Sequence, residues 1–87
     1  MKIKSGFVLK EIAGSHLVVP LGSQVVDFGA IIKLSETGAF LWSMLEQESS
    51  YEQLVCALTS EYDVDKAKAQ KDVDSFINKL KEADLLE

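Results

Sequence analysis

The sequence predicts an α+β fold, winged-helix-like in outline, in which a three-stranded antiparallel sheet is followed by a three-helix bundle. Two observations predict it: short apolar runs broken by turn residues fill the first 34 positions, and apolar residues at helical spacing fill the rest. Short consecutive strands with tight connections favour an antiparallel meander, and helices that follow it cover one of its faces. The 87 residues suffice for one domain, residues 1–87, and not for two.

Three strands are expected. Phe7–Ile12 and His16–Pro20 form the first two, and Ala13–Ser15 supplies the turn between them. Pro20 ends the second strand because it has no N–H to donate to a neighbour. Ala30–Leu34 forms the third strand. The tight connections place the second strand in the middle of the sheet and leave the third at an edge.

The third strand is the more informative edge. Alternation puts Ile32 and Leu34 on one face of the sheet and Ile31 and Lys33 on the other. An apolar edge guarded by one lysine is a template to which a further strand can pair. The ordinary alternative is an edge covered by a loop or by a second copy of the chain.

The first two helices have clear start signals. Ser35 is a suitable N-cap for the first helix, whose first turn carries a glutamate. Two overlapping capping boxes precede the second helix, Ser49 with Glu52 and Ser50 with Gln53, and the sequence does not choose between them.

The third helix has the clearest amphipathic pattern in the chain. Asp65 can cap it, and Leu85-Leu86 is expected to pack back on the core beyond its end. Its apolar residues recur at helical spacing: Ala69, Val73, Phe76, Ile77 and Leu80.

Composition limits the possible partners. The net charge is −5, from 14 acidic and nine basic residues, and every basic residue is a lysine. Arginine is the usual bidentate reader of phosphate and guanine, so its absence argues against nucleic acid as a partner. The acidic balance argues against an anionic membrane surface. A single cysteine and the lack of a signal or membrane-spanning segment indicate the cytoplasm.

No catalytic constellation is present in the sequence. His16 is the sole histidine and is expected to be an exposed or hydrogen-bonded strand residue rather than a catalyst. Cys56 is expected to be a buried, inert thiol of the second helix. The carboxylates around the third helix lack the glycine and terminal glutamate of a calcium loop. We therefore expect no catalytic residue, no metal, no cofactor and no enzymatic activity.

Lysines gather on the third helix. Lys68, Lys71 and Lys79, with Ser75 between them, share one outward face. One interpretation is a solvated face with Lys68 and Asp72 as an i, i+4 ion pair. The other is a shallow basic rim that steers an acidic peptide toward the helix. The sequence leaves both open.

The order of several segments resembles the PqqD-like proteins, which are peptide chaperones also called recognition elements for ribosomally made, post-translationally modified peptides. The most specific segment, Leu34 to Trp42, is similar to the family signature L-N-E-T-G-A-x-x-W. Two positions depart from the family pattern: Ser35 replaces an expected asparagine, and Asp84 stands where glycine is common. The other matching segments are Phe7-Val8-Leu9, Val18-Val19-Pro20, Val26-Asp27-Phe28, Leu54-Val55, Glu61-Tyr62-Asp63-Val64, Asp72-Val73-Phe76-Leu80 and Leu85-Leu86.

The resemblance implies a non-catalytic chaperone that binds the leader segment of a precursor peptide as an added antiparallel strand. Such a chaperone presents the peptide to a modifying enzyme, often a radical S-adenosylmethionine (SAM) enzyme. Gly38 is expected to let the backbone or Trp42 pack closely. The implied peptide-binding residues are Gly29, Ala30, Ile31, Ile32 and Lys33 on the strand and Lys71, Asp72, Ser75, Phe76 and Lys79 on the helix.

Two alternative functions share this fold. A winged-helix nucleic-acid-binding protein would use the third helix, which also carries four acidic residues that repel phosphate. A general protein-interaction adaptor, or a homodimer, would pair through the same edge strand.

Overall fold

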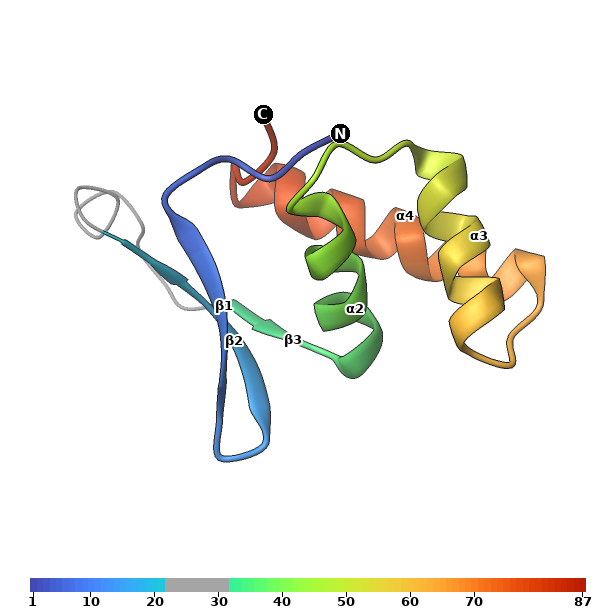
Figure 1. Ribbon diagram of the computed structural model, residues 1–87, viewed down its shortest axis with the longest axis horizontal. Helices are drawn as coiled ribbons and strands as arrows, with labels where there is room; N and C mark the ends of the chain where they lie inside the picture. Colours follow the sequence, from blue (N-terminus) through green and yellow to red (C-terminus); the bar gives the residue numbers. More distant parts are fainter. Residues whose placement is uncertain (22–31) are drawn as a thin grey trace.

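The computed structural model describes residues 1–21 and 32–87, and within them the elements follow the predicted order. In Figure 1 the strands lie on one side of the molecule and the helices gather on the other. The elements are β1 (Phe7–Ile12), β2 (Ser15–Pro20), β3 (Ile32–Leu34), α2 (Glu36–Leu45), α3 (Tyr51–Glu61) and α4 (Lys66–Glu82). Within these ranges no helix is both long and apolar enough to cross a bilayer.

The sheet is antiparallel with the order β1-β2-β3, which confirms β2 as the middle strand. The β1–β2 turn is tighter than predicted. Ala13 and Gly14 have φ values of 52° and 80°, the positive values that a two-residue hairpin turn needs. Ser15 therefore pairs with Ile12 as the first residue of β2 instead of lying in the turn.

One hydrophobic core joins the sheet to the helices. Val18 on the middle strand and Trp42 on α2 are 0% and 1% exposed. Leu34 is buried, Ile32 packs against the core and Lys33 is exposed, which confirms the predicted alternation for the described part of β3. The other fully buried large side chains are Leu41, Leu45, Leu54, Leu58, Val73, Leu80 and Leu85.

Each helix begins at a side-chain cap. Ser35 Oγ accepts from Gly38 N at 3.1 Å, and Asp65 Oδ1 accepts from Lys68 N at 2.8 Å. At α3 the structure chooses the second of the two capping boxes, Ser50 with Gln53. All three caps satisfy backbone N–H groups that a helix start leaves unpaired.

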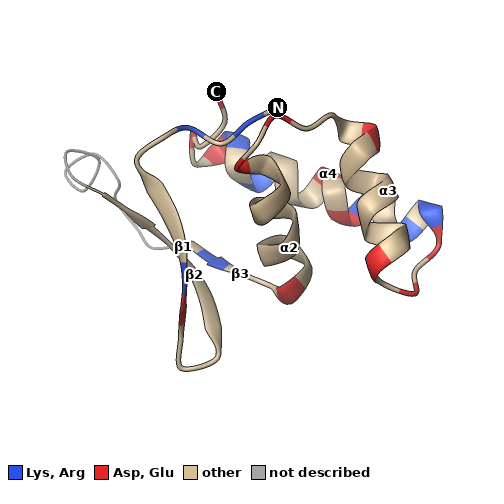
Figure 2. Ribbon diagram, in the orientation of Figure 1, with Lys and Arg blue, Asp and Glu red and all other residues tan. Residues whose placement is uncertain are grey.

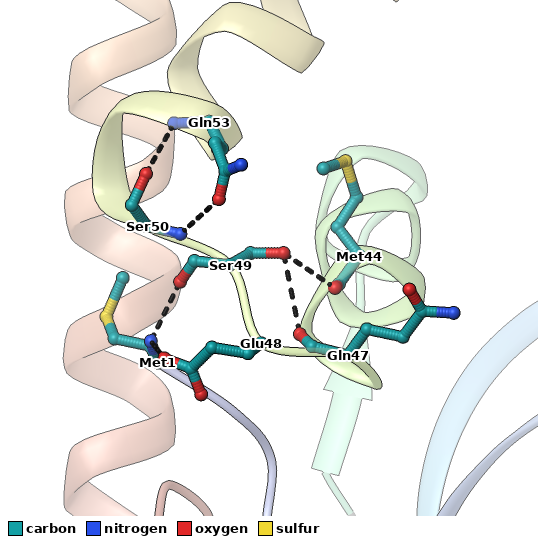
Figure 3. Close-up of polar contacts among 7 residues, drawn as sticks. All are labelled: Met1, Met44, Gln47, Glu48, Ser49, Ser50 and Gln53. Atoms are coloured by element: carbon teal, nitrogen blue, oxygen red, sulfur yellow. Dashed lines mark hydrogen bonds and ion pairs between the residues drawn. The ribbon is translucent and has the colours of Figure 1, made fainter.

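Ser49 has a different role in the connection between α2 and α3. Its side chain is buried, and its Oγ donates to the backbone oxygens of Met44 at 3.0 Å and Gln47 at 3.4 Å (Figure 3). The Met1 ammonium group binds Glu48 at 2.6 Å and the Ser49 carbonyl at 2.8 Å in the same region. These contacts fix the connection against the first residues of the chain.

The end of α4 turns at Asp84, in a backbone conformation that favours glycine. Asp84 has a φ of 57°, in the left-handed region. Its N–H donates to the Lys81 carbonyl at 3.1 Å, and Leu85 N donates to the Leu80 carbonyl at 2.9 Å, the two bonds of a Schellman motif. This reversal returns the chain to the core, where Leu85 is fully buried, as predicted.

Candidate functional site

The edge of β3 lies beside α4. In the described part of the chain, β2 is the only strand that pairs with β3. The opposite side of β3 is close enough to α4 for Lys79 Nζ to donate to the Lys33 carbonyl oxygen at 3.2 Å. A strand edge and a helix therefore meet with one cation between them.

A shallow pocket of about 160 Å³ opens at this junction. The end of β3 and the first turns of α2 form one wall, and the outward face of α4 forms the other. Among the described residues its lining consists of Leu34, Ser35, Thr37, Gly38, Leu41, Asp72, Ser75, Phe76 and Lys79.

Gly38 lets the first turn of α2 pack closely against the end of β3, at one wall of this pocket. A Cβ at this position would lie 3.3 Å from both Leu34 Cβ and Ser35 Oγ, closer than an ordinary contact. The close approach expected of this glycine is therefore to β3 and the helix cap. Trp42, the other expected neighbour, is not among the three nearest contacts of such a Cβ.

The structure brings together four of the five helix residues predicted for the site. Asp72, Ser75, Phe76 and Lys79 line the pocket, whereas Lys71 is exposed and is not part of the lining. Phe76 serves the core as well, because its side chain is only 6% exposed.

On the strand side, Ile32 and Lys33 lie in β3, and Lys33 contacts α4 through its carbonyl oxygen. Gly29, Ala30 and Ile31 lie outside the described residues. The sequence prediction did not include the α2 wall, Leu34 to Leu41. Its signal was present: the Ser35 cap directly follows the strand, so the first helical turn has to lie at the strand end.

Among the described residues, two charged ones line the pocket, Asp72 and Lys79. Lys68 and Asp72 form the predicted ion pair at 3.3 Å, so the carboxylate in the lining already has a partner. Lys33 and Lys79 form no ion pair with a carboxylate of residues 1–21 or 32–87. Figure 2 shows lysines on α4 and β3, whereas the charged residues of α2 and α3 are all acidic. The pocket therefore offers one cation, Lys79, that has no carboxylate partner among the described residues.

Cys56 is exposed, so the expectation of a buried thiol was wrong. The buried residues of α3 are Leu54, Val55 and Leu58, and position 56 points to the opposite side of the helix. Cys56 lines a separate hollow of about 580 Å³ between α3 and α4. His16 is half-buried on β2, opposite Leu34. Within the described ranges no three His, Cys, Asp or Glu residues are grouped to hold a metal ion.

Two tyrosines on the helices have shifted pKa values. Partial burial raises the pKa of the Tyr51 phenol above its ordinary value, and the Asp74 carboxylate raises it further. The pKa of Tyr62 is raised by partial burial and then by the charges of Glu36 and Glu61. Neither tyrosine lines the pocket beside β3.

Comparison with known proteins gives two kinds of match. The family model described as coenzyme PQQ synthesis protein D (PqqD) matches residues 6–86. A solved structure described as "TbiB1 in Complex with the TbiA(beta) Leader Peptide" is similar with a TM-score of 0.76 and 30% identity, over 100% of this chain and 95% of that one.

A second solved structure, "Lasso peptide synthetase B1 complexed with the leader peptide", shares the fold. Its TM-score is 0.71 at 22% identity, over 93% of this chain and 89% of that one. No curated protein matches the chain. The family model covers nearly the whole sequence, and the chain therefore belongs to the PqqD family of non-catalytic domains.

Proposed function

We propose that residues 1–87 act as a peptide-recognition domain that binds the leader segment of a ribosomally made precursor peptide. The leader pairs with β3 as an added antiparallel strand and lies against α4. The domain presents the bound precursor to a modifying enzyme, such as a radical SAM enzyme. Precursors of this kind are made on ribosomes, so the proposed place of action is the cytoplasm.

The observation that carries this proposal is the β3 edge beside the pocket. An added strand gains main-chain hydrogen bonds that do not depend on its sequence, and a neighbouring pocket selects among its side chains. A side chain of such a strand can enter the pocket, whose lining includes Ser75, Phe76 and Lys79. The relative at 30% identity, whose solved structure is described as a complex with a leader peptide, supports a leader peptide as the ligand.

The domain needs no chemistry of its own for this role. A micromolar complex corresponds to about −8 kcal/mol, which a short strand with two or three buried anchors can supply. Holding a substrate beside its enzyme raises the effective concentration of the substrate.

Backbone-modified peptides test strand addition without altering the protein. The probe is the N-terminal segment of a short precursor encoded beside the gene for this chain, and its affinity is measured by calorimetry. Two variants carry N-methyl groups on alternate residues, one set for each side of the strand. One set should abolish binding and the other should leave it within about twofold, because alternate amides of a strand point to opposite sides.

Three outcomes would contradict the proposal. They are equal binding by both methylated peptides, no binding of any neighbouring precursor, and amide shifts confined to α4 on addition of duplex DNA. The NMR spectrum of the labelled protein separates these cases, since strand addition must shift the Ile32 to Leu34 amides together with those from Asp72 to Lys79. A self-paired edge predicts a dimer of the free protein that dissociates when saturating peptide is added, and sedimentation measures both states.

A further inference from the structure

We propose that Lys79 makes the site selective for leader segments that carry an acidic side chain beside β3. This inference rests on the proposed function, because it names the chemistry of the peptide that the same edge would accept. It starts from the hydrogen bond between Lys79 Nζ and the Lys33 carbonyl.

The bond occupies an acceptor that an added strand needs. In an antiparallel strand, alternate residues direct both their N–H and their C=O to the same neighbour. The Lys33 carbonyl reaches Lys79 on α4, so the groove side of β3 presents its hydrogen-bonding groups at Lys33. A peptide strand that pairs there displaces the ammonium group from this oxygen.

The displaced ammonium group is exposed, so it returns to water unless the peptide offers it an acceptor. Among the described residues that line the pocket, Asp72 is the one carboxylate, and it is paired with Lys68 at 3.3 Å. A neutral peptide therefore exchanges this bond for hydration of the ammonium group, whereas a peptide with Glu or Asp at the right position replaces it with an ion pair.

A scan with paired peptides tests this selectivity. Each position of the leader segment is replaced in turn by Glu and by Gln, and dissociation constants are measured for the natural protein and for Lys79→Met. At one position the Glu peptide should bind the natural protein about threefold to fivefold more tightly than the Gln peptide. For Lys79→Met the dissociation constants of the Glu and Gln peptides should agree within about 1.5-fold. This variant should also bind the Gln peptide slightly more tightly than the natural protein does.

Lys81→Met is the matched control. It removes the same charge from the same helix, but Lys81 does not line the pocket and should leave the Glu preference intact. A Glu preference that survives Lys79→Met, or that Lys81→Met removes equally, would overturn the inference. So would equal binding of Glu and Gln peptides at every position, which would still leave strand addition standing. The proposed function fails separately, if the natural protein binds neither set.

Discussion

Substitution of Asp84 tests the end of α4. Its left-handed φ of 57° strains any residue that has a Cβ, by roughly 1–2 kcal/mol for an ordinary side chain. Glycine escapes that strain but loses roughly 0.5–1 kcal/mol more chain entropy on folding. We therefore expect the free energy of unfolding of Asp84→Gly to exceed that of Asp84→Ala by about 1 kcal/mol. In a thermal unfolding experiment this difference corresponds to ~4–8 °C in the midpoint temperature.

The natural protein, with Asp84, should have a free energy of unfolding close to that of Asp84→Gly. Aspartate tolerates the left-handed region better than alanine does, and its carboxylate contacts Lys4 at 2.9 Å. The two side chains are 38% and 88% exposed, so this ion pair contributes at most about 1 kcal/mol. A Lys4→Met variant measures that contribution independently.

The assay is urea unfolding followed by circular dichroism, with a control at Glu82. This residue is the last one of α4 and still has helical backbone angles, so glycine should be destabilising there by up to about 1 kcal/mol relative to alanine. The order of the two variants should therefore invert: glycine more stable at 84, alanine more stable at 82. Equal stability of Asp84→Gly and Asp84→Ala would refute the left-handed helix end.

Three further predictions concern the helices. Gln53→Ala should lower the free energy of unfolding by about 1 kcal/mol, because Gln53 Oε1 accepts from the Ser50 N–H at 2.8 Å. Glu52→Ala should leave the free energy of unfolding almost unchanged in 1 M NaCl, because salt screens the interaction of Glu52 with the helix dipole. An equal loss of stability in Gln53→Ala and Glu52→Ala would contradict the observed capping box. Asp74→Asn should lower the pKa of Tyr51 in a spectrophotometric titration, since the carboxylate disfavours the phenolate. An unchanged pKa of Tyr51 in this variant would contradict the role of Asp74. The raised pKa also means that folding stability falls as the pH rises above about 10, because the unfolded chain loses its phenol proton first. Cys56 should react with a disulfide reagent at a similar rate with and without denaturant, because it is exposed. A reaction that waits for unfolding would contradict that exposure.

Much of the fold was predictable because it follows local rules. The Asp65 cap, the helical period of α4 and the alternation at β3 each depend on residues close together in the sequence. The position of β2 followed from the order of the strands in the chain, because strands that are consecutive in sequence usually pair. The Asp84 end was flagged only as a departure from glycine, and the structure supplies the reason in its positive φ.

The remaining features depend on contacts that no local pattern specifies. Lys79 and Lys33 are 46 positions apart, and their contact requires α4 to cross the strand edge. Ser49 and Ser50 offer equal capping chemistry, and the packing of the connection between α2 and α3 decides between them. Cys56 was misplaced because its neighbours are apolar, although its angular position on α3 points it to solvent.

The bridge between Ile3 and Leu86 has a practical consequence for protein engineering. It holds the first and last residues of the chain side by side (Figure 1), with further bonds from Lys4 N to Leu85 O and from Glu87 N to Lys2 O. A short linker can join such ends, so circular permutation at the Ala13–Gly14 turn should preserve the fold. Because the two ends lie side by side, residues 1–87 can also be inserted into a surface loop of a host enzyme without forcing the two ends of that loop apart.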